Sequence, residues 1–133
     1  MTGNEILKLA YDIMSEEESS NTEFAAFVPG ILTVLLAETW ACNNNLRLSK
    51  GLPVMTEIPT VTAATMGEQI PYEMEVQLTV LPYGICEKYA DGDGDTAKTA
   101  YYNSLYVNGV NYCLRGISQE GGVEDLYSKV GQT

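Results

Sequence analysis

Histidine is absent from this chain of 133 residues, and basic residues are scarce. Because histidine is the commonest general base near neutral pH and the commonest transition-metal ligand, its absence excludes histidine-dependent catalytic triads. Seven Lys and Arg residues stand against 18 Asp and Glu residues, which gives a net charge of −11, and the few cations do not cluster. A surface that neutralises phosphates needs such a cluster, so we expect no specific binding of nucleic acid.

Cysteines and long apolar runs are also limited. The three cysteines, Cys42, Cys86 and Cys113, are odd in number and form no Cys-x-x-Cys motif. This pattern favours buried thiols in a reducing compartment over a disulfide framework or a zinc site. The longest apolar run, residues 24–37, is too short to span a membrane, and the N-terminus lacks the basic region of a signal peptide. We therefore expect a soluble protein without a membrane partner.

What is present predicts one helical domain. An apolar content of 45 % in a chain of this length is enough for an ordinary core. Thr2 and Glu5 form a capping-box pattern, and apolar residues at helical spacing then predict a helix over residues 4–16. A second helix is capped by Asn21 or Thr22 and carries a wide apolar stripe from residue 24 to 36. Pro29 either starts this helix or kinks it.

Residues 43–69 are predicted to be a long connector between the second and third helices. Pro, Gly, Thr and Val dominate here in short alternating stretches such as "VMTEIPTVTA". These could pair as a small two-stranded β-ribbon, although Pro53 and Pro59 limit pairing to an edge. An extended arm is the open alternative. Connectors of this length in small domains usually have a function.

The second half of the chain predicts two more helices and a tail. Pro71 suits the first turn of the third helix, which should be kinked at Pro82 and end at "YADGDGD". The fourth helix follows through "TAKTAYYNSLYVNGVNYCL", with Gly109 weakening its latter half. We thus predict an all-α fold, a small four-helix bundle over residues 1–115 with the connector at 43–69. A flexible C-terminal docking tail occupies residues 116–133.

The stretch "DGDGDTAKTAYY" raises the question of a calcium site. A loop of the EF-hand kind needs acids at its first, third and fifth positions, glycine at the sixth and a bidentate acid at the twelfth. Asp91, Asp93 and Asp95 meet the first requirement, but Thr96 and Tyr102 occupy the last two positions. We therefore interpret the stretch as a turn in which Asp93 or Asp95 caps the next helix, and predict no metal, cofactor or catalytic residue.

Several motifs in residues 69–128 resemble those of one family. They are a Pro-Tyr pair that opens a helix, a Leu-Pro-Tyr-Gly-Leu type of motif, an Asp-rich turn, and a helix with Ala, an aromatic-Asn pair and a later Tyr. The matching residues are Pro71, Tyr72, Leu81 to Ile85, Asp91 to Asp95, Ala100, Tyr102, Asn103 and Tyr106, followed by Glu124 to Tyr127. This set resembles the small head-tail connector, or adaptor, proteins of tailed bacteriophages and prophages. Ile85 in place of the usual Leu and the scarcity of Lys and Arg depart from the family pattern.

The resemblance implies a structural virion protein with no enzymatic role. Copies would form a ring, dodecameric by analogy, at the neck of the virion after assembly in the bacterial cytoplasm. The implied partners are the portal protein, a tail or stopper protein and further copies of this chain, with DNA passing through the channel without specific binding. For interface residues we name Val123, Leu126 and Tyr127, because apolar groups on a short polar tail need a partner to bury against.

Two other functions fit the composition. One is a small acidic helical module in the cytoplasm, such as a phage-encoded inhibitor or DNA mimic, with its acids gathered on one face. The other is a calcium-dependent module. The first predicts a discrete monomer or dimer, and the second a melting temperature that depends on calcium.

Overall fold

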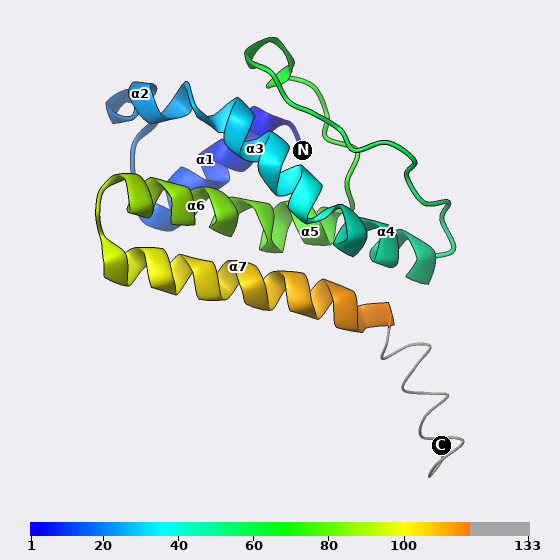
Figure 1. Cartoon of the computed structure of the whole chain (residues 1–133). Coiled ribbons are helices and arrows are strands. Elements are labelled where there is room, and N and C mark those ends of the chain that lie inside the picture. Colours follow the sequence, from blue (N-terminus) through cyan, green and yellow to red (C-terminus); the bar gives the residue numbers. More distant parts are fainter. Residues whose placement is uncertain (118–133) are drawn as a thin grey trace.

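The computed structural model describes residues 1–117, which are mostly helical (Figure 1). The α-helices are α1 (Gly3–Met14), α2 (Thr22–Ala25), α3 (Val28–Glu38), α4 (Trp40–Ser49), α5 (Met74–Thr79), α6 (Leu81–Gly92) and α7 (Thr96–Ile117). Two 3-10 turns, η1 (Glu18–Ser20) and η2 (Ala63–Thr65), complete the elements. Residues 1–117 contain no β-strand, so the all-α prediction is confirmed. Helices in this part of the chain are more numerous than the four predicted, because the second and third predicted helices are each divided.

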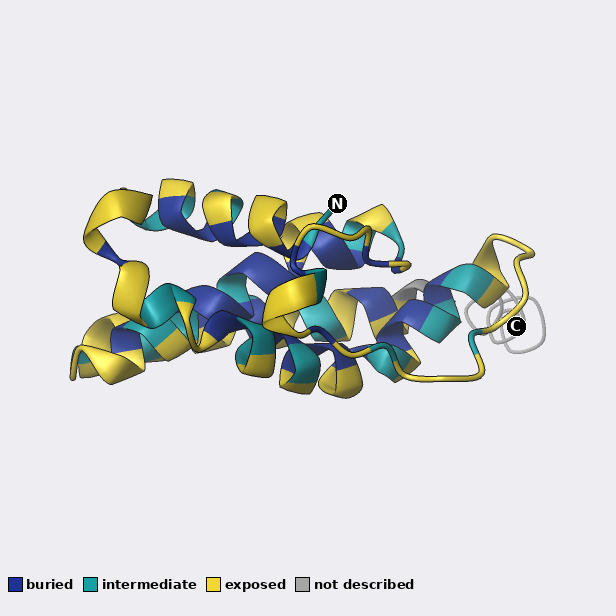
Figure 2. Cartoon of the chain, turned by 90° about the horizontal axis from the view of Figure 1, so that it is seen from above, coloured by how far each residue is buried: buried dark blue, intermediate teal, exposed yellow. Residues whose placement is uncertain are grey.

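The long α7 lies antiparallel to α6, and the two form a hairpin that the other helices cover (Figure 1). Helices α1 and α3 pack against α6, and α4 packs against α7. Figure 2 shows the buried residues on the sides of the helices that face one another, whereas the coil between α4 and α5 is mostly exposed. None of the helices within residues 1–117 has the length and apolar character needed to cross a bilayer.

Helix α1 begins as the sequence predicts. The backbone N–H of Glu5 donates to Thr2 Oγ1 at 3.1 Å, and the backbone N–H of Thr2 donates to Glu5 Oε1 at 2.8 Å. This reciprocal pair satisfies two N–H groups that a helix start otherwise leaves without partners. The helix ends at Ser15, whose left-handed conformation (φ 58°) stops the chain from continuing.

The second predicted helix begins later than its apolar stripe. Helix α3 begins at Val28, with Pro29 in its first turn, and the preceding residues form only the short α2. Proline is tolerated there because the first turn needs no backbone N–H donors. The sequence left two alternatives for Pro29, a helix start or a kink, and the structure shows that Pro29 lies at the helix start.

The third predicted helix is two helices. The break lies at Val80 (φ −122°, ψ −59°), and Pro82 stands in the first turn of α6, so the expected kink is a complete interruption. The predicted start at Pro71 is wrong, because α5 begins at Met74. The Gln77 side chain donates to the carbonyl oxygens of Ile70 (3.2 Å) and Tyr72 (2.6 Å), which stabilises the extended backbone before α5.

Two glycines allow α6 and α7 to approach their neighbours closely. A Cβ at Gly84 would lie 2.8 Å from both methyl groups of Leu35, and one at Gly109 would lie 2.8 Å from the backbone oxygen of Thr79. Gly109 therefore sits where α7 crosses the junction of α5 and α6, and α7 continues through it to Ile117. The predicted weakening at Gly109 is wrong, because tertiary contacts outweigh the low helix propensity of glycine.

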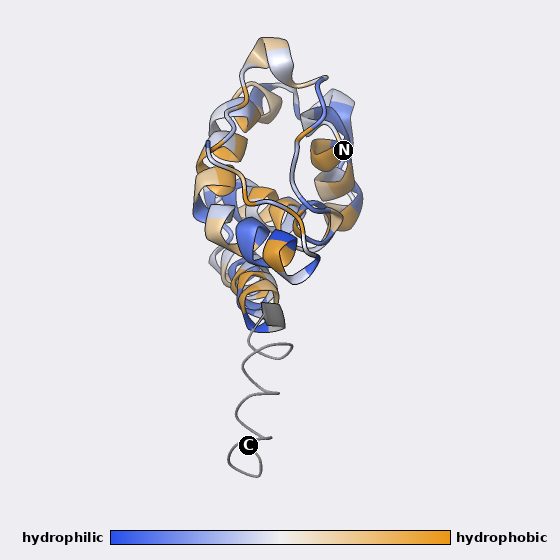
Figure 3. Ribbon diagram, turned by 90° about the vertical axis from the view of Figure 1, so that its right-hand side faces the viewer, coloured by the Kyte–Doolittle hydropathy of each residue, from blue (hydrophilic) through white to orange (hydrophobic). Residues whose placement is uncertain are grey.

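The connector observed in the structure differs from the one predicted at residues 43–69. Its first seven residues belong to α4, and the segment from Lys50 to Glu73, here called the connector, is coil apart from η2. Residues 50–73 form no β-ribbon, only an isolated antiparallel bridge between Thr2 and Gln69. Figure 3 views the molecule from the end where the connector lies, and its coil carries both hydrophobic and hydrophilic residues. The segment is coil that packs on helices of its own chain, so neither the predicted ribbon nor the predicted arm describes it.

Candidate interaction surface

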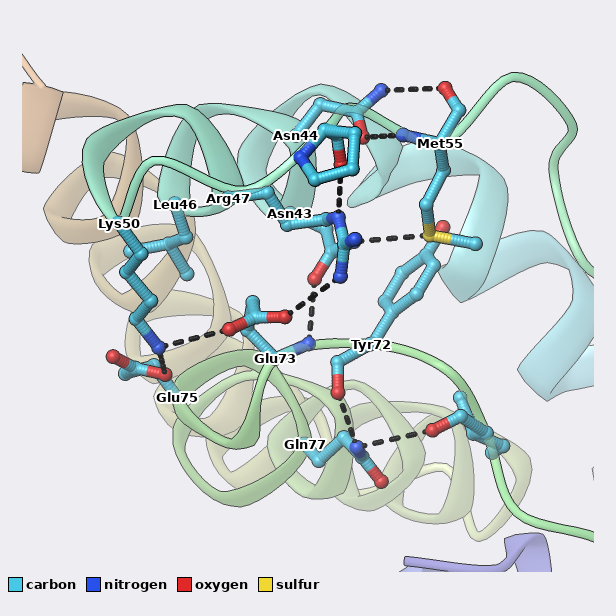
Figure 4. A network of polar contacts seen from close by, with 12 residues as sticks. Asn43, Asn44, Leu46, Arg47, Lys50, Met55, Tyr72, Glu73, Glu75 and Gln77 are labelled. Carbon is cyan, nitrogen blue, oxygen red and sulfur yellow. Dashed lines mark hydrogen bonds and ion pairs between the residues drawn. The ribbon is translucent and has the colours of Figure 1, made fainter.

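Side chains of α4 hold the first part of the connector through its backbone (Figure 4). Arg47 Nε donates to the Pro53 carbonyl oxygen at 2.6 Å. Asn44 forms a pair of bonds with Met55: its Oδ1 accepts from the backbone N–H at 2.8 Å, and its Nδ2 donates to the carbonyl oxygen at 3.3 Å. A side-chain amide that bonds both backbone groups of one residue replaces the pairing a neighbouring strand would supply. The coil at residues 53–55 therefore has a defined position without belonging to a sheet.

Asn43 joins the two ends of the connector. Its side chain is fully buried. Its Oδ1 accepts from the backbone N–H of Glu73 at 2.7 Å, and its Nδ2 donates to Met55 Sδ at 3.2 Å. Because a buried amide is costly without partners, these bonds specify one arrangement of α4, Met55 and Glu73.

Ion pairs reinforce the same corner. Glu73 accepts from Arg47 at 3.1 Å and from Lys50 at 2.9 Å, and Lys50 also reaches Glu75 at 2.8 Å (Figure 4). The hydrogen bond from Lys50 holds the pKa of Glu75 below its ordinary value, and the same bond raises the pKa of Lys50. Lys50 and Glu75 are both partly exposed, so this pair stabilises the fold only modestly.

The later part of the connector is held by α3 and by the start of α1. Thr33 Oγ1 donates to the Val61 carbonyl oxygen at 3.0 Å and accepts from the Val61 N–H at 2.9 Å. The backbone N–H of Asn4 donates to the Met66 carbonyl oxygen at 3.0 Å, and that of Ile70 donates to the Met1 carbonyl oxygen at 2.9 Å. The side chains of Val61, Met66 and Ile70 are buried in the core. The connector is thus attached along most of its length.

Between these attachments, the connector presents apolar side chains to solvent. Leu52, Val54 and Ile58 are 39 %, 43 % and 46 % exposed, and Leu48 at the end of α4 is 57 % exposed. Single exposed apolar residues are ordinary on protein surfaces. Here three of them, Leu52, Val54 and Ile58, fall within seven residues of a coil whose backbone is held on both sides. Their side chains therefore stay exposed at the surface of a single copy. Leu52, Val54 and Ile58 are our candidate interaction surface.

A second set of exposed apolar residues lies on α7. Its members are Tyr101, Val107, Tyr112 and Leu114. Tyr101 and Tyr112 are separated by three turns and share one side of the helix, whereas Val107 and Leu114 are separated by two turns and share another. Both sides flank the line of Tyr102, Tyr106 and Cys113 that α7 buries against the bundle.

The aspartate turn does not assemble a metal site within residues 1–117. Asp95 caps α7 by accepting from the backbone N–H of Lys98 at 3.0 Å, which is one of the two predicted capping positions. Gly94 supplies the positive φ of 74° that the turn requires. Asp91 and Asp95 line separate surface hollows, and no group of three potential metal ligands occurs in the described part of the chain.

Residues that carry the family resemblance divide between the core and the surface. Leu81 and Ile85 are fully buried. The hydroxyl of Tyr106 donates to Glu38 Oε1 at 2.7 Å, and burial followed by this bond raises the pKa of Tyr106. The hydroxyl of Tyr72 donates to the Leu36 carbonyl oxygen at 2.5 Å. The buried members of the motif therefore serve packing, whereas Pro71, Ala100, Asn103 and residues 91–94 are exposed. The predicted interface residues Val123, Leu126 and Tyr127 lie outside the described residues.

Sequence reasoning missed the α4 side chains that hold the connector. Asn43, Asn44 and Arg47 stand in "NNNLR", whose polar composition is typical of a loop. The available signal was the spacing of Cys42 and Leu46, four residues apart, which both face the core. Comparison with known proteins adds no relative: no protein-family model matches the chain, and no curated protein or solved structure does.

Proposed function

We propose that this chain is a structural virion protein, a head-tail connector that forms a ring between the portal and the tail and extends the DNA channel. The sequence resemblance over residues 69–128 supports the family, and the exposed apolar residues of the anchored connector support self-assembly. The second observation carries the proposal, because it concerns side chains that have no partner within the described part of one copy.

A ring places different constraints on a subunit than a twofold dimer does. Each copy must meet its neighbours through two different patches, because the contact is head-to-tail. The chain offers apolar side chains on two separate elements: Leu52, Val54 and Ile58 on the connector, and the exposed apolar residues of α7. In the proposed ring, Leu52, Val54 and Ile58 of one copy pack on one of the two exposed apolar sides of α7 of the next.

The charge of the chain agrees with a channel for DNA. A net charge of −11 repels phosphates, so DNA would pass a wall of such subunits without adhering. Lys8, Arg47 and Lys50 form ion pairs with carboxylates, which reduces the positive charge available to DNA further. Attachment to the portal is assigned to residues 117–133, with Val123, Leu126 and Tyr127 as the apolar contacts.

The test is binding to the portal protein encoded by the same genome. Portal rings are mixed with the full-length chain, and the bound copies per ring are measured by sedimentation. We expect cooperative binding of a fixed number of copies. Deletion of residues 117–133 should abolish it. The triple variant Leu52→Ser, Val54→Ser, Ile58→Ser should still bind the portal, but with lost cooperativity.

Phe27→Ser is the matched control, since Phe27 is another exposed apolar residue and lies outside both surfaces. It should leave the number of bound copies and the cooperativity unchanged. Unaltered portal binding after the deletion would contradict the role of the tail. A full-length chain that stays a discrete monomer or dimer and ignores the portal would favour an acidic cytoplasmic binding module instead.

A further inference from the structure

Two buried cysteines from distant parts of the chain meet between α4 and α7. Cys42 in the first turn of α4 and Cys113 near the end of α7 are each 1 % exposed, and neither is in a disulfide. The thiol of Cys42 donates to the Val110 carbonyl oxygen at 3.4 Å, one helical turn before Cys113. Val110 and Cys113 are three residues apart and lie on the same face of α7, so the Cys42 side chain packs beside that of Cys113.

This contact makes the two sulfurs chemically unequal. The neighbouring Cys42 thiol lowers the pKa of Cys113, whereas the neighbouring Cys113 thiol and burial raise the pKa of Cys42. Because the thiolate is the reactive form, Cys113 is the first nucleophile of the pair. Cys86 differs from both: its thiol donates to the Ala10 carbonyl oxygen at 3.6 Å, and burial raises its pKa to about 12.

We propose that Cys42 and Cys113 are an oxidative cross-linking site, at which a small-molecule disulfide such as oxidised glutathione joins α4 covalently to α7. The inference rests on the geometry of these helices and does not depend on the function proposed above.

The reaction is two thiol–disulfide exchanges. The Cys113 thiolate attacks one sulfur of oxidised glutathione, which forms a mixed disulfide and releases one glutathione thiolate. Cys42 then loses its proton to solvent and attacks the Cys113 sulfur, which forms the Cys42–Cys113 bond and releases the second glutathione. Two protein thiols are oxidised, and one molecule of oxidised glutathione is reduced to two thiols.

The position of Cys113 provides a route for the reagent. It lies four residues before Ile117, the last residue of α7. The final turns of a helix open at a lower free energy than the core does, so local opening exposes Cys113 while the rest of the fold persists. Reclosure of α7 then returns the mixed disulfide to Cys42. The cross-link fixes the end of α7, from which residues 118–133 continue.

Tryptic mapping of the full-length protein tests the proposal directly. Trypsin cleaves after Lys8, Arg47, Lys50, Lys88, Lys98, Arg115 and Lys129, so the three cysteines fall on three peptides, residues 9–47, 51–88 and 99–115. The reduced protein is equilibrated with reduced and oxidised glutathione at set ratios and then acid-quenched. We expect a linked peptide pair 9–47 with 99–115, a loss of about 2 Da in the intact protein and a free thiol at Cys86.

The equilibrium constant for forming the Cys42–Cys113 disulfide with glutathione shows whether the native fold favours this bond. If the native fold favours the cross-link, the constant measured against glutathione should be about 100-fold larger for the folded protein than in urea, and the oxidised form should melt on the order of 10 °C higher. Cys86→Ala should keep the linkage, and Cys113→Ser should abolish it. Three free thiols at equilibrium, a lasting glutathione adduct on Cys113, a linkage to Cys86, or equal constants in the two states would each overturn the proposal.

Discussion

The α6–α7 hairpin and the α4–connector region are held in place by different forces. In the hairpin, Gly84 and Gly109 let helices approach until a Cβ would contact Leu35 or the Thr79 oxygen at 2.8 Å. Stability there comes from apolar area and close packing, which respond to changes of a single methyl group.

In the α4–connector region, polar side chains bond to backbone. Asn43, Asn44 and Arg47 hold Pro53, Met55 and Glu73 of the connector, largely through backbone groups that a helix or sheet would otherwise have bonded. Apolar packing is non-directional and tolerates repacking, whereas such bonds require one particular geometry. The comparison teaches that one small domain can hold a helical hairpin in place by close apolar packing and a coil by side-chain hydrogen bonds to its backbone.

The largest expected effect is on the hairpin side. Gly109→Val should lower the free energy of unfolding by about 3 kcal/mol, because the new side chain meets the Thr79 backbone, which cannot move aside easily. Urea unfolding measures this. Gly30→Val is the control, since Gly30 is also in a helix but has nothing within 4 Å of its Cβ position. The control should change the stability by less than about 1 kcal/mol, and equal losses at both sites would refute close packing at Gly109.

The three consecutive asparagines of α4 provide a graded test of the connector side. Asn43→Ala should cost about 2 kcal/mol, because it leaves the backbone N–H of Glu73 without a partner. Asn44→Ala should cost about 1 kcal/mol, since Met55 can bond to water instead. Asn45 has no side-chain hydrogen bond within residues 1–117, and Asn45→Ala should be within about 0.5 kcal/mol of wild type.

The measurement for this series is urea unfolding of all three variants in one buffer. The order of the three losses is the result that matters. If Asn45→Ala were as harmful as Asn43→Ala, helix propensity or solubility would explain the losses, and the anchoring role of Asn43 would be wrong.

The smallest expected effect is the pH dependence of the ion pair between Lys50 and Glu75. The pKa of Glu75 is lowered from 4.5, so its stabilising contribution is present above pH 4.5 and is lost as the pH falls through the folded-state pKa. The pKa of Lys50 is raised from 10.5, so its contribution is present below pH 10.5 and is lost as the pH rises through the folded-state value.

Glu75→Gln should therefore lower the melting temperature by at most about 2 °C near neutral pH, and the difference should vanish in strong acid. Thermal unfolding at several pH values measures it, and about 1 M salt should reduce it. Glu57→Gln, in the exposed part of the connector, is the control and should show no such dependence. A difference that grew as the pH fell would contradict the pairing.

Much of the hairpin side could be predicted from the sequence. The helical character of residues 96–115 and the capping role of the aspartate turn follow from local chemistry that operates within a few residues, as does the capping box of Thr2 and Glu5 in α1 outside the hairpin. The apolar periodicity of α1 marks the face that it buries, because helix geometry alone brings such residues together. For α7 the pattern predicts a buried face of Ala97, Tyr101, Leu105 and Tyr112, and this is wrong: Tyr101 and Tyr112 are exposed, and the neighbouring line of Tyr102, Tyr106 and Cys113 is buried instead.

The connector side could not be predicted in the same way. The polar run "NNNLR" has poor intrinsic helix propensity, and it forms α4 because Cys42 and Leu46 pack inward while Asn43 finds Met55 and Glu73 far along the chain. The break at Val80 likewise depends on contacts that local propensity does not encode. The outward position of Leu52, Val54 and Ile58 follows only from where the backbone is attached.

The sequence by itself determined an acidic, histidine-free, all-helical chain with a capped first helix and a capped aspartate turn, because composition, periodicity and caps are local properties. Only the tertiary structure decided where helices stop, which way the connector turns its apolar residues, and which two of three cysteines meet. Those outcomes depend on partners between about 10 and 70 residues away in the chain, and such contacts leave no periodic signal in the residues that make them.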